Sequence, residues 1–284
     1  MTRLLLAASV VLALGHGAPP QQAVFSARVT NVRVDALVTD GRQVLPGLQP
    51  ADFEVLDNGV VQQVDLMAAE RVPLNVVLAL DMSGSVTGER LTHLRVAAKL
   101  VVDALLPGEK VGLILFNAGV GVQTALTTDF TLVRRALDAP SNGGDTALVD
   151  ASYAAMTLSE SDSGRALAIV FSDGADTASF LSGASVVTTA RRSDAVVYAA
   201  SAGGAGRSTF LRDLCETTGG RLLNVRSTSG LGEAFVSILE EFRQRYLISF
   251  TPRGVPTDGW HDLTVRVKNR RNAEVKARRG YFGK

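Results

Sequence analysis

The sequence has little cysteine and little histidine. Its 284 residues include one cysteine, Cys215, so no disulfide can form within the chain. Beyond the first 22 residues only His93 and His261 remain, and they are not spaced as a zinc pair. A Gly-x-Ser-x-Gly elbow and a phosphate-binding Walker loop are also absent. These absences argue against a zinc enzyme, a serine hydrolase and a nucleotide-hydrolysing enzyme.

Apolar runs long enough to cross a membrane are lacking as well. Arg3 precedes an apolar run at residues 4–14, and small residues follow at positions 15–18. This order is typical of a secretory signal peptide, and the run is shorter than the ~20 residues of a transmembrane helix. We therefore expect a signal peptide at about residues 1–18, a secreted or periplasmic protein and no transmembrane helix in the mature chain. An uncleaved membrane anchor is the alternative.

Charge is unevenly distributed along the chain. Residues 245–284 hold ten Lys and Arg against three Asp and Glu, although the formal net charge of the whole chain is only +1. Such a segment could bind anionic polymers. However, Arg266 and Lys268 alternate with Val265 and Val267, as on the solvated face of a strand, and no stacking aromatic residues lie between the charges. We therefore expect no nucleic-acid partner.

Two apolar stretches end in carboxylates. The first, Leu-Asn-Val-Val-Leu-Ala-Leu-Asp-Met-Ser-Gly-Ser, closes with Asp81, Ser83 and Ser85, and the second, residues 166–172, leads into Asp173. Short apolar runs of this kind are typical of strands buried on both faces, and ligands bind at the carboxyl ends of parallel strands. One carboxylate with two hydroxyls suits a hard divalent cation. For the first motif alone, a capped helix start is the alternative.

The region between and after these stretches alternates strand and helix patterns. This alternation predicts an α/β fold in which helices cover both faces of a doubly wound, mostly parallel sheet. The two flanks instead show β alternation, with an Asp-Asn-Gly hairpin signal at residues 57–59 and a single return strand over residues 60–66. Each flank is too small to bury a core alone, so we expect the two to join into one small antiparallel β unit.

Taken in order, the motifs resemble the metal-ion-dependent adhesion site of von Willebrand factor A (VWA) domains. They are Asp-x-Ser-x-Ser, then a Thr after Gly-Gly, then Asp-Gly at a strand end. The resemblance covers residues 73–243 and implies a VWA/Rossmann-like fold, as in bacterial secreted proteins with VWA-related domains. With the signal-peptide and flank patterns above, we expect a leader and linker (1–22), an N-terminal β segment (23–72), the VWA domain (73–243) and a C-terminal β segment (244–284).

The resemblance also implies a set of metal ligands and a partner. Ser83, Ser85 and Thr146 would be hydroxyl ligands, and the carboxylates of Asp81 and Asp173 would bind the metal directly or through water. The full set of predicted ligands is therefore Asp81, Ser83, Ser85, Thr146 and Asp173. Asp145 and Asp176 are auxiliary candidates. The middle motif is shorter than the usual Gly-Gly-Thr-x-Thr, and Asp145 stands within it. Mg²⁺ or Mn²⁺ would then hold a protein partner through an Asp or Glu carboxylate.

Two other functions fit parts of the same pattern. An envelope structural or assembly component could keep the fold with a vestigial metal site. A metal-dependent phosphatase could use Asp81 as the nucleophile at a strand end. In haloacid-dehalogenase-type phosphatases a second Asp two residues on acts as the acid, but here Ser83 holds that position. We therefore expect a binding protein rather than an enzyme.

Overall fold

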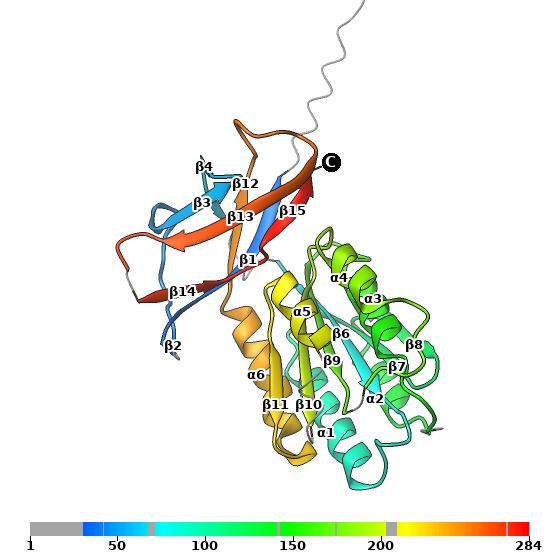
Figure 1. Ribbon diagram of the computed structural model, residues 1–284. Coiled ribbons are helices and arrows are strands. Elements are labelled where there is room, and N and C mark those ends of the chain that lie inside the picture. Colours follow the sequence, from blue (N-terminus) through cyan, green and yellow to red (C-terminus); the bar gives the residue numbers. More distant parts are fainter. Residues whose placement is uncertain are drawn as a thin grey trace, which may run out of the picture.

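The chain folds into an α/β domain and a β unit packed at one end of it (Figure 1). This computed structural model describes residues 31–41, 43–67, 72–140, 143–173, 175–202, 209–270 and 272–283. The predicted signal peptide lies outside these residues. Within them, no helix is both long enough and apolar enough to cross a membrane.

Six strands form the central sheet of the α/β domain. In spatial order they are β11 (Leu222–Val225), β10 (Val196–Ala202), β9 (Arg165–Phe171), β6 (Leu74–Asp81), β7 (Lys110–Phe116) and β8 (Val120–Thr127). All neighbours pair in parallel except β7 and β8, which are antiparallel. The doubly wound, mostly parallel sheet is thus confirmed.

Helices cover both faces of this sheet. They are α1 (Glu89–Asp103), α2 (Phe130–Leu137), α3 (Leu148–Ser159), α4 (Gly183–Ala190), α5 (Thr209–Thr218) and α6 (Leu231–Arg243). One core joins α1, α2 and α6 to one face, and a second core joins α3, α4 and α5 to the other. Cys215 lies on α5 in the second core, where burial raises the pKa of its thiol well above the ordinary value. It is therefore a small apolar core residue.

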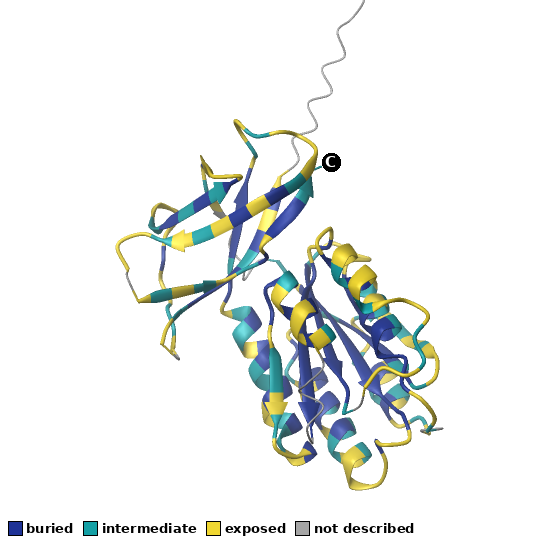
Figure 2. Cartoon of the chain, in the orientation of Figure 1, coloured by how far each residue is buried: buried dark blue, intermediate teal, exposed yellow. Residues whose placement is uncertain are grey.

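The strand β6 shows why the domain folds this way. All eight of its residues are buried, as the dark blue central strands of Figure 2 show. Val76, Leu78 and Leu80 enter the core with α1 and α6, whereas Val77 and Ala79 enter the core with α3. Because side chains alternate across a strand, only a continuous apolar run can satisfy helices on both faces. Polar side chains are therefore displaced to the strand ends.

The β unit consists of two antiparallel sheets. One has the order β14 (Ala273–Lys276), β1 (Val32–Asp40), β12 (Tyr246–Phe250) and β5 (Asp65–Met67), with β2 (Gln43–Val44) also on β1. The other has the order β15 (Gly280–Gly283), β13 (Gly259–Val267), β3 (Phe53–Asp57) and β4 (Val60–Gln62). A shared core from both ends of the chain fills the unit. The antiparallel β unit built from both flanks is confirmed, while the predicted domain boundaries stay a prediction.

Several details of the β unit differ from the prediction. The hairpin at Asn58 and Gly59 forms as expected, with positive φ at both residues, as a type I′ turn requires. The single return strand over residues 60–66 is wrong, since β4 and β5 join different sheets. Buried Gln62 lies at this break and bonds the carbonyl and amide of Arg253. Two further pairings were not predicted, since β14 pairs with β1 and β15 pairs with β13.

Two buried arginines connect the β unit to the α/β domain. Arg165 on β9 forms an ion pair with Asp35 of β1, with 2.5 Å between Nη2 and Oδ1. Arg245, between α6 and β12, donates to the Tyr198 hydroxyl at 2.6 Å, the Gly219 carbonyl at 2.7 Å and the Asp35 carbonyl at 3.2 Å. Each arginine therefore bonds groups of both parts, which fixes the β unit against the domain.

Candidate metal centre

The predicted carboxylates meet at one edge of the central sheet. Asp81 is the last residue of β6, and Asp173 stands two residues beyond the end of β9. These two strands are parallel neighbours in which Leu80 lies opposite Phe171. Both carboxylates therefore lie where the carboxyl ends of parallel strands converge, the usual ligand position in such sheets.

Hydrogen bonds join four of the predicted ligands into one network. The amide of Ser83 donates to Asp81 Oδ1 at 2.8 Å. The hydroxyls of Ser83 and Ser85 lie 3.2 Å apart, and the Ser85 hydroxyl donates to Asp173 Oδ1 at 2.6 Å. The loop between β6 and α1 thus folds back on the end of β9, and it brings two carboxylates and two hydroxyls together.

Asp81 lies in the least hydrated part of the network. Its side chain is fully buried. Burial raises the pKa of Asp81, while hydrogen bonds from Ser83 and Ser172 lower it in part; the Ser172 hydroxyl donates at 2.7 Å. A cation beside this carboxylate would favour its ionised form, so metal binding and loss of the proton are coupled here.

Thr146 lies on a loop that contacts the first motif. The amide of Gly84 donates to the Gly144 carbonyl at 3.0 Å, which holds the two loops together. Gly143 and Gly144 both have positive φ, a conformation that glycine adopts readily. Thr146 itself is buried, and its amide donates to the Thr177 hydroxyl at 2.9 Å. The middle motif therefore adjoins the two serines across the loop contact.

The two auxiliary candidates lie outside this network. Asp145 is exposed on the loop before Thr146. Asp176 accepts hydrogen bonds from the Val149 amide at 3.1 Å and the Ser179 hydroxyl at 2.6 Å. Asp176 thus satisfies one of the free amides at the start of α3 and shapes the following loop.

Two functional candidates escaped the sequence prediction. Ser172, next to Asp173, donates a hydrogen bond to Asp81. In the sequence, only its position at the end of a strand could have indicated a role in the site. Arg90 on α1 forms an ion pair with Asp173 at 3.0 Å. Together with Arg226, it also lines a cavity of about 160 Å³ beside Asp173. Nothing in the sequence pairs Arg90 with a carboxylate 83 positions away.

The donor chemistry fits a hard divalent cation. In the part of the chain that the structure describes, no three His, Cys, Asp or Glu side chains come together as a metal cluster. The network instead offers two carboxylates and several hydroxyls, all of them oxygen donors. Mg²⁺ and Mn²⁺ prefer oxygen donors, and Mg²⁺ keeps several of its waters, so a site with few carboxylates suits it.

A family model described as the von Willebrand factor type A domain matches residues 75–236, more than half of the chain. The chain belongs to the von Willebrand factor A family. Domains of this family generally act as interaction modules rather than enzymes, and commonly bind a divalent cation at the metal-ion-dependent adhesion site (MIDAS). No curated protein matches the chain.

Solved structures of other proteins superpose on the chain. A von Willebrand factor type A protein from Catenulispora acidiphila has a TM-score of 0.56, at 13% identity over 88% of this chain and 73% of its own. Proximal thread matrix protein 1 from the mussel byssus has a TM-score of 0.53, at 18% identity over 60% of this chain and 48% of its own. A structure of that mussel protein with a zinc-occupied MIDAS motif has a TM-score of 0.51, with the same sequence identity and coverage as the first mussel structure.

The matched part of this chain thus spans about half the length of the mussel protein. At these identities the likeness shows the fold alone. Which residues bind a metal in this chain, and which metal they bind, stay predictions that rest on the site's own geometry.

Proposed function

We propose that this chain captures an acidic group of a protein partner through Mg²⁺ or Mn²⁺ held at the MIDAS. The observation that carries the proposal is the continuous network from Asp81 through Ser83 and Ser85 to Asp173 at the carboxyl end of the sheet. These four residues, with Thr146, would hold the ion. The ion would supply an electrophilic point at which a carboxylate oxygen binds.

Charge around the site favours an acidic ligand. The serine and threonine hydroxyls are neutral, so only the carboxylates of Asp81 and Asp173 would compensate the ion's positive charge, and Arg90 already offsets part of the charge of Asp173. Arg90 and Arg226 line the cavity beside Asp173 and add positive potential. A carboxylate on the partner completes this arrangement, whereas a Lys or Arg would be repelled.

A fully exposed aromatic side chain stands on a loop tied to Thr146. The amides of Thr177 and Ala178 donate to the Thr146 carbonyl at 2.9 and 3.2 Å. Further along the loop, the Phe180 amide donates to Asp150 at 2.9 Å, while the Phe180 side chain is 97% exposed. Aromatic side chains, including phenylalanine, are enriched at protein interfaces. We propose that Phe180 packs against an apolar group of the partner beside the bound carboxylate.

Metal binding is tested by calorimetric titration of Mg²⁺ and Mn²⁺ into the full chain. Asp81→Ala should abolish binding, and Ser85→Ala should weaken it less because it removes only a neutral ligand. Asp258→Ala is the matched control, since Asp258 is an exposed aspartate outside the site. Equal metal binding by wild type and Asp81→Ala would contradict the proposal.

Partner capture is tested with immobilised protein and envelope extract, in Mg²⁺ and in chelator. A partner retained only in Mg²⁺, and lost with Asp81→Ala, supports capture through the ion. A partner retained equally in chelator favours an envelope component with a vestigial site. Phe180→Ala should weaken capture while leaving the metal titration unchanged.

We also propose that the protein is exported, because residues 1–18 have the order of a signal peptide. Mass spectrometry of the mature protein should find a new N-terminus between Ala18 and Ala23. An intact Met1 in a cytosolic fraction would contradict export.

A further inference from the structure

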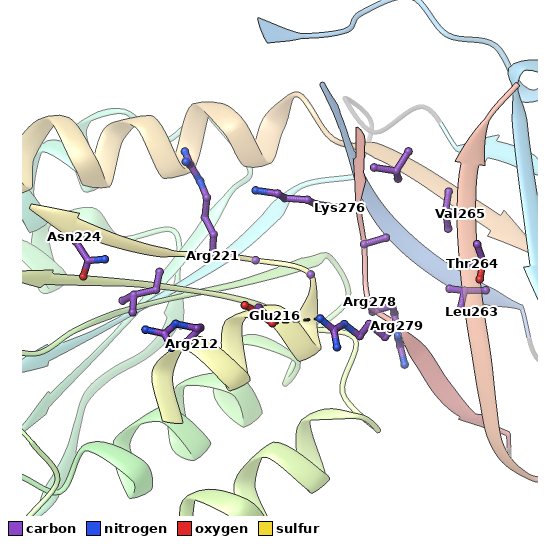
Figure 3. Close-up of a pocket in the computed structure, with 15 residues that line it drawn as sticks. Arg212, Glu216, Arg221, Asn224, Leu263, Thr264, Val265, Lys276, Arg278 and Arg279 are labelled. Carbon is purple, nitrogen blue, oxygen red and sulfur yellow. Dashed lines mark hydrogen bonds and ion pairs between the residues drawn. The ribbon is translucent and has the colours of Figure 1, made fainter. Parts of the chain in front are cut away.

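A second candidate binding site lies between the VWA domain and the β unit. This basic cleft has a volume of about 640 Å³, within the range of ligand pockets. One wall comes from α5 and β11, and the other comes from β13, β14 and the segment that follows β14 (Figure 3). None of the predicted metal ligands lines it, and it lies along the sheet edge formed by β11.

The side chains of the cleft are predominantly cationic. Five of the lining residues are basic and one, Glu216, is acidic; the basic ones are Arg212, Arg221, Lys276, Arg278 and Arg279. Three of them come from the basic C-terminal segment. Arg221, Arg278 and Arg279 form ion pairs with Glu241, Asp194 and Glu216, respectively. Lys276 forms none with any residue that the structure describes. Figure 3 shows Lys276 extending from β14 toward the VWA domain.

The strand β11 presents to the same cleft a backbone edge with which no other strand of the described residues pairs. It is the outermost strand of the central sheet and pairs with β10. The Arg221 carbonyl accepts from the Ala199 amide, so residues 221 and 223 direct their backbone groups toward β10. Backbone direction alternates along a strand, which leaves the amides and carbonyls of Leu222 and Asn224 facing outward. Both residues line the cleft.

From these two features we infer that the basic cleft binds an extended acidic peptide, which adds to the sheet as a strand beside β11. Exposed strand edges bind extended peptides through main-chain hydrogen bonds, and flanking side chains select the sequence. Here the backbone of Leu222 and Asn224 would pair with the peptide. Its Glu or Asp side chains would meet Lys276, Arg212 and Arg279. This site needs no metal ion.

The test measures fluorescence anisotropy of a labelled ten-residue peptide of alternating Val and Glu, added to the full chain in chelator. Working in chelator separates this site from the MIDAS. Binding of the Val-Glu peptide is expected, and it should fall at least about tenfold when Gln replaces Glu, because charge complementarity is lost. Methylation of alternate backbone nitrogens should weaken binding similarly, since it removes the strand's donors.

Lys276→Glu is the diagnostic variant, because Lys276 lines the cleft without an ion pair that the fold would lose. This variant should bind the Val-Glu peptide at least about tenfold more weakly than wild type. The midpoint of its unfolding transition should be unchanged. Arg253→Glu is the matched control, an exposed charge reversal in the β unit outside the cleft, and should change affinity less than about twofold. The inference would be overturned if the Val-Glu peptide did not bind, or if Lys276→Glu and Arg253→Glu lost equal affinity for it. Full binding of the methylated peptide would also overturn the inference.

Discussion

The VWA domain and the β unit use polar residues in opposite ways. In the central sheet, every residue of β9 and β10 is buried, and the polar groups of the candidate metal centre stand at and beyond the strand ends. In the β unit, polar groups lie inside the fold. Buried Asp57 accepts from Tyr281 at 2.5 Å and lies 2.7 Å from Nδ1 of buried His261. The polar side chains at these strand ends are therefore available for a ligand, whereas Asp57, His261 and Tyr281 bond one another inside the β unit.

The largest effect is expected at the junction of the two regions. Arg245→Met should lower the free energy of unfolding by at least about 2 kcal/mol, because the carbonyls of Asp35 and Gly219 lose a buried donor at about 1–3 kcal/mol each. Chemical denaturation measures the change. Arg253→Met, an exposed site, should have little effect. Equal stability of the two variants would mean that the junction does not hold the β unit in place.

A smaller loss is expected inside the β unit. Tyr281→Phe removes one donor from buried Asp57 and should cost about 1–3 kcal/mol. Tyr153→Phe on α3 is the control, since Tyr153 is partly exposed. Denaturation curves that show no loss for Tyr281→Phe would contradict the structural role assigned to this buried cluster.

The smallest effect is expected at the candidate metal centre, where Arg90 would share Asp173 with the proposed ion. Arg90→Gln should tighten Mg²⁺ binding by up to about fivefold, because the Arg90 side chain is exposed, ion pairs to exposed side chains contribute ~0.2–1 kcal/mol, and this pair would compete with the metal. Arg134→Gln, which breaks an exposed ion pair with Asp103, should leave the calorimetric titration unchanged. Weaker Mg²⁺ binding by Arg90→Gln would show that the arginine organises the site instead.

The sequence predicts the two regions unequally well. Strands β6 and β9 follow from their continuous apolar runs, and the proximity of Asp81 and Asp173 follows from parallel pairing. Ser172 and Arg90 could not be assigned, because their contacts join positions 83 or more residues apart. Such contacts depend on how loops and helices pack, which no local pattern encodes.

Errors in the β unit have a similar origin. The turn at Asn58 and Gly59 was predictable from local backbone preferences, but the partners of the short strands were not. The alternation in β14 indicates a strand without identifying β1 as its neighbour. The strand β15, Gly-Tyr-Phe-Gly, is too short and too rich in glycine to show a period. Pairing between distant segments is decided by the shared core, which forms only when both ends of the chain meet.

The most direct test of the account is the unfolding of wild type and Asp81→Asn, each in chelator and in Mg²⁺. In chelator the variant should be about as stable as wild type or more so, since it removes a buried carboxylate. Mg²⁺ at a hundred times its dissociation constant should stabilise wild type by ~2.7 kcal/mol and leave the variant unchanged. Equal stabilisation of both proteins, or an unfolded variant in chelator, would contradict the claim that this strand-end site binds metal and is not needed for the fold.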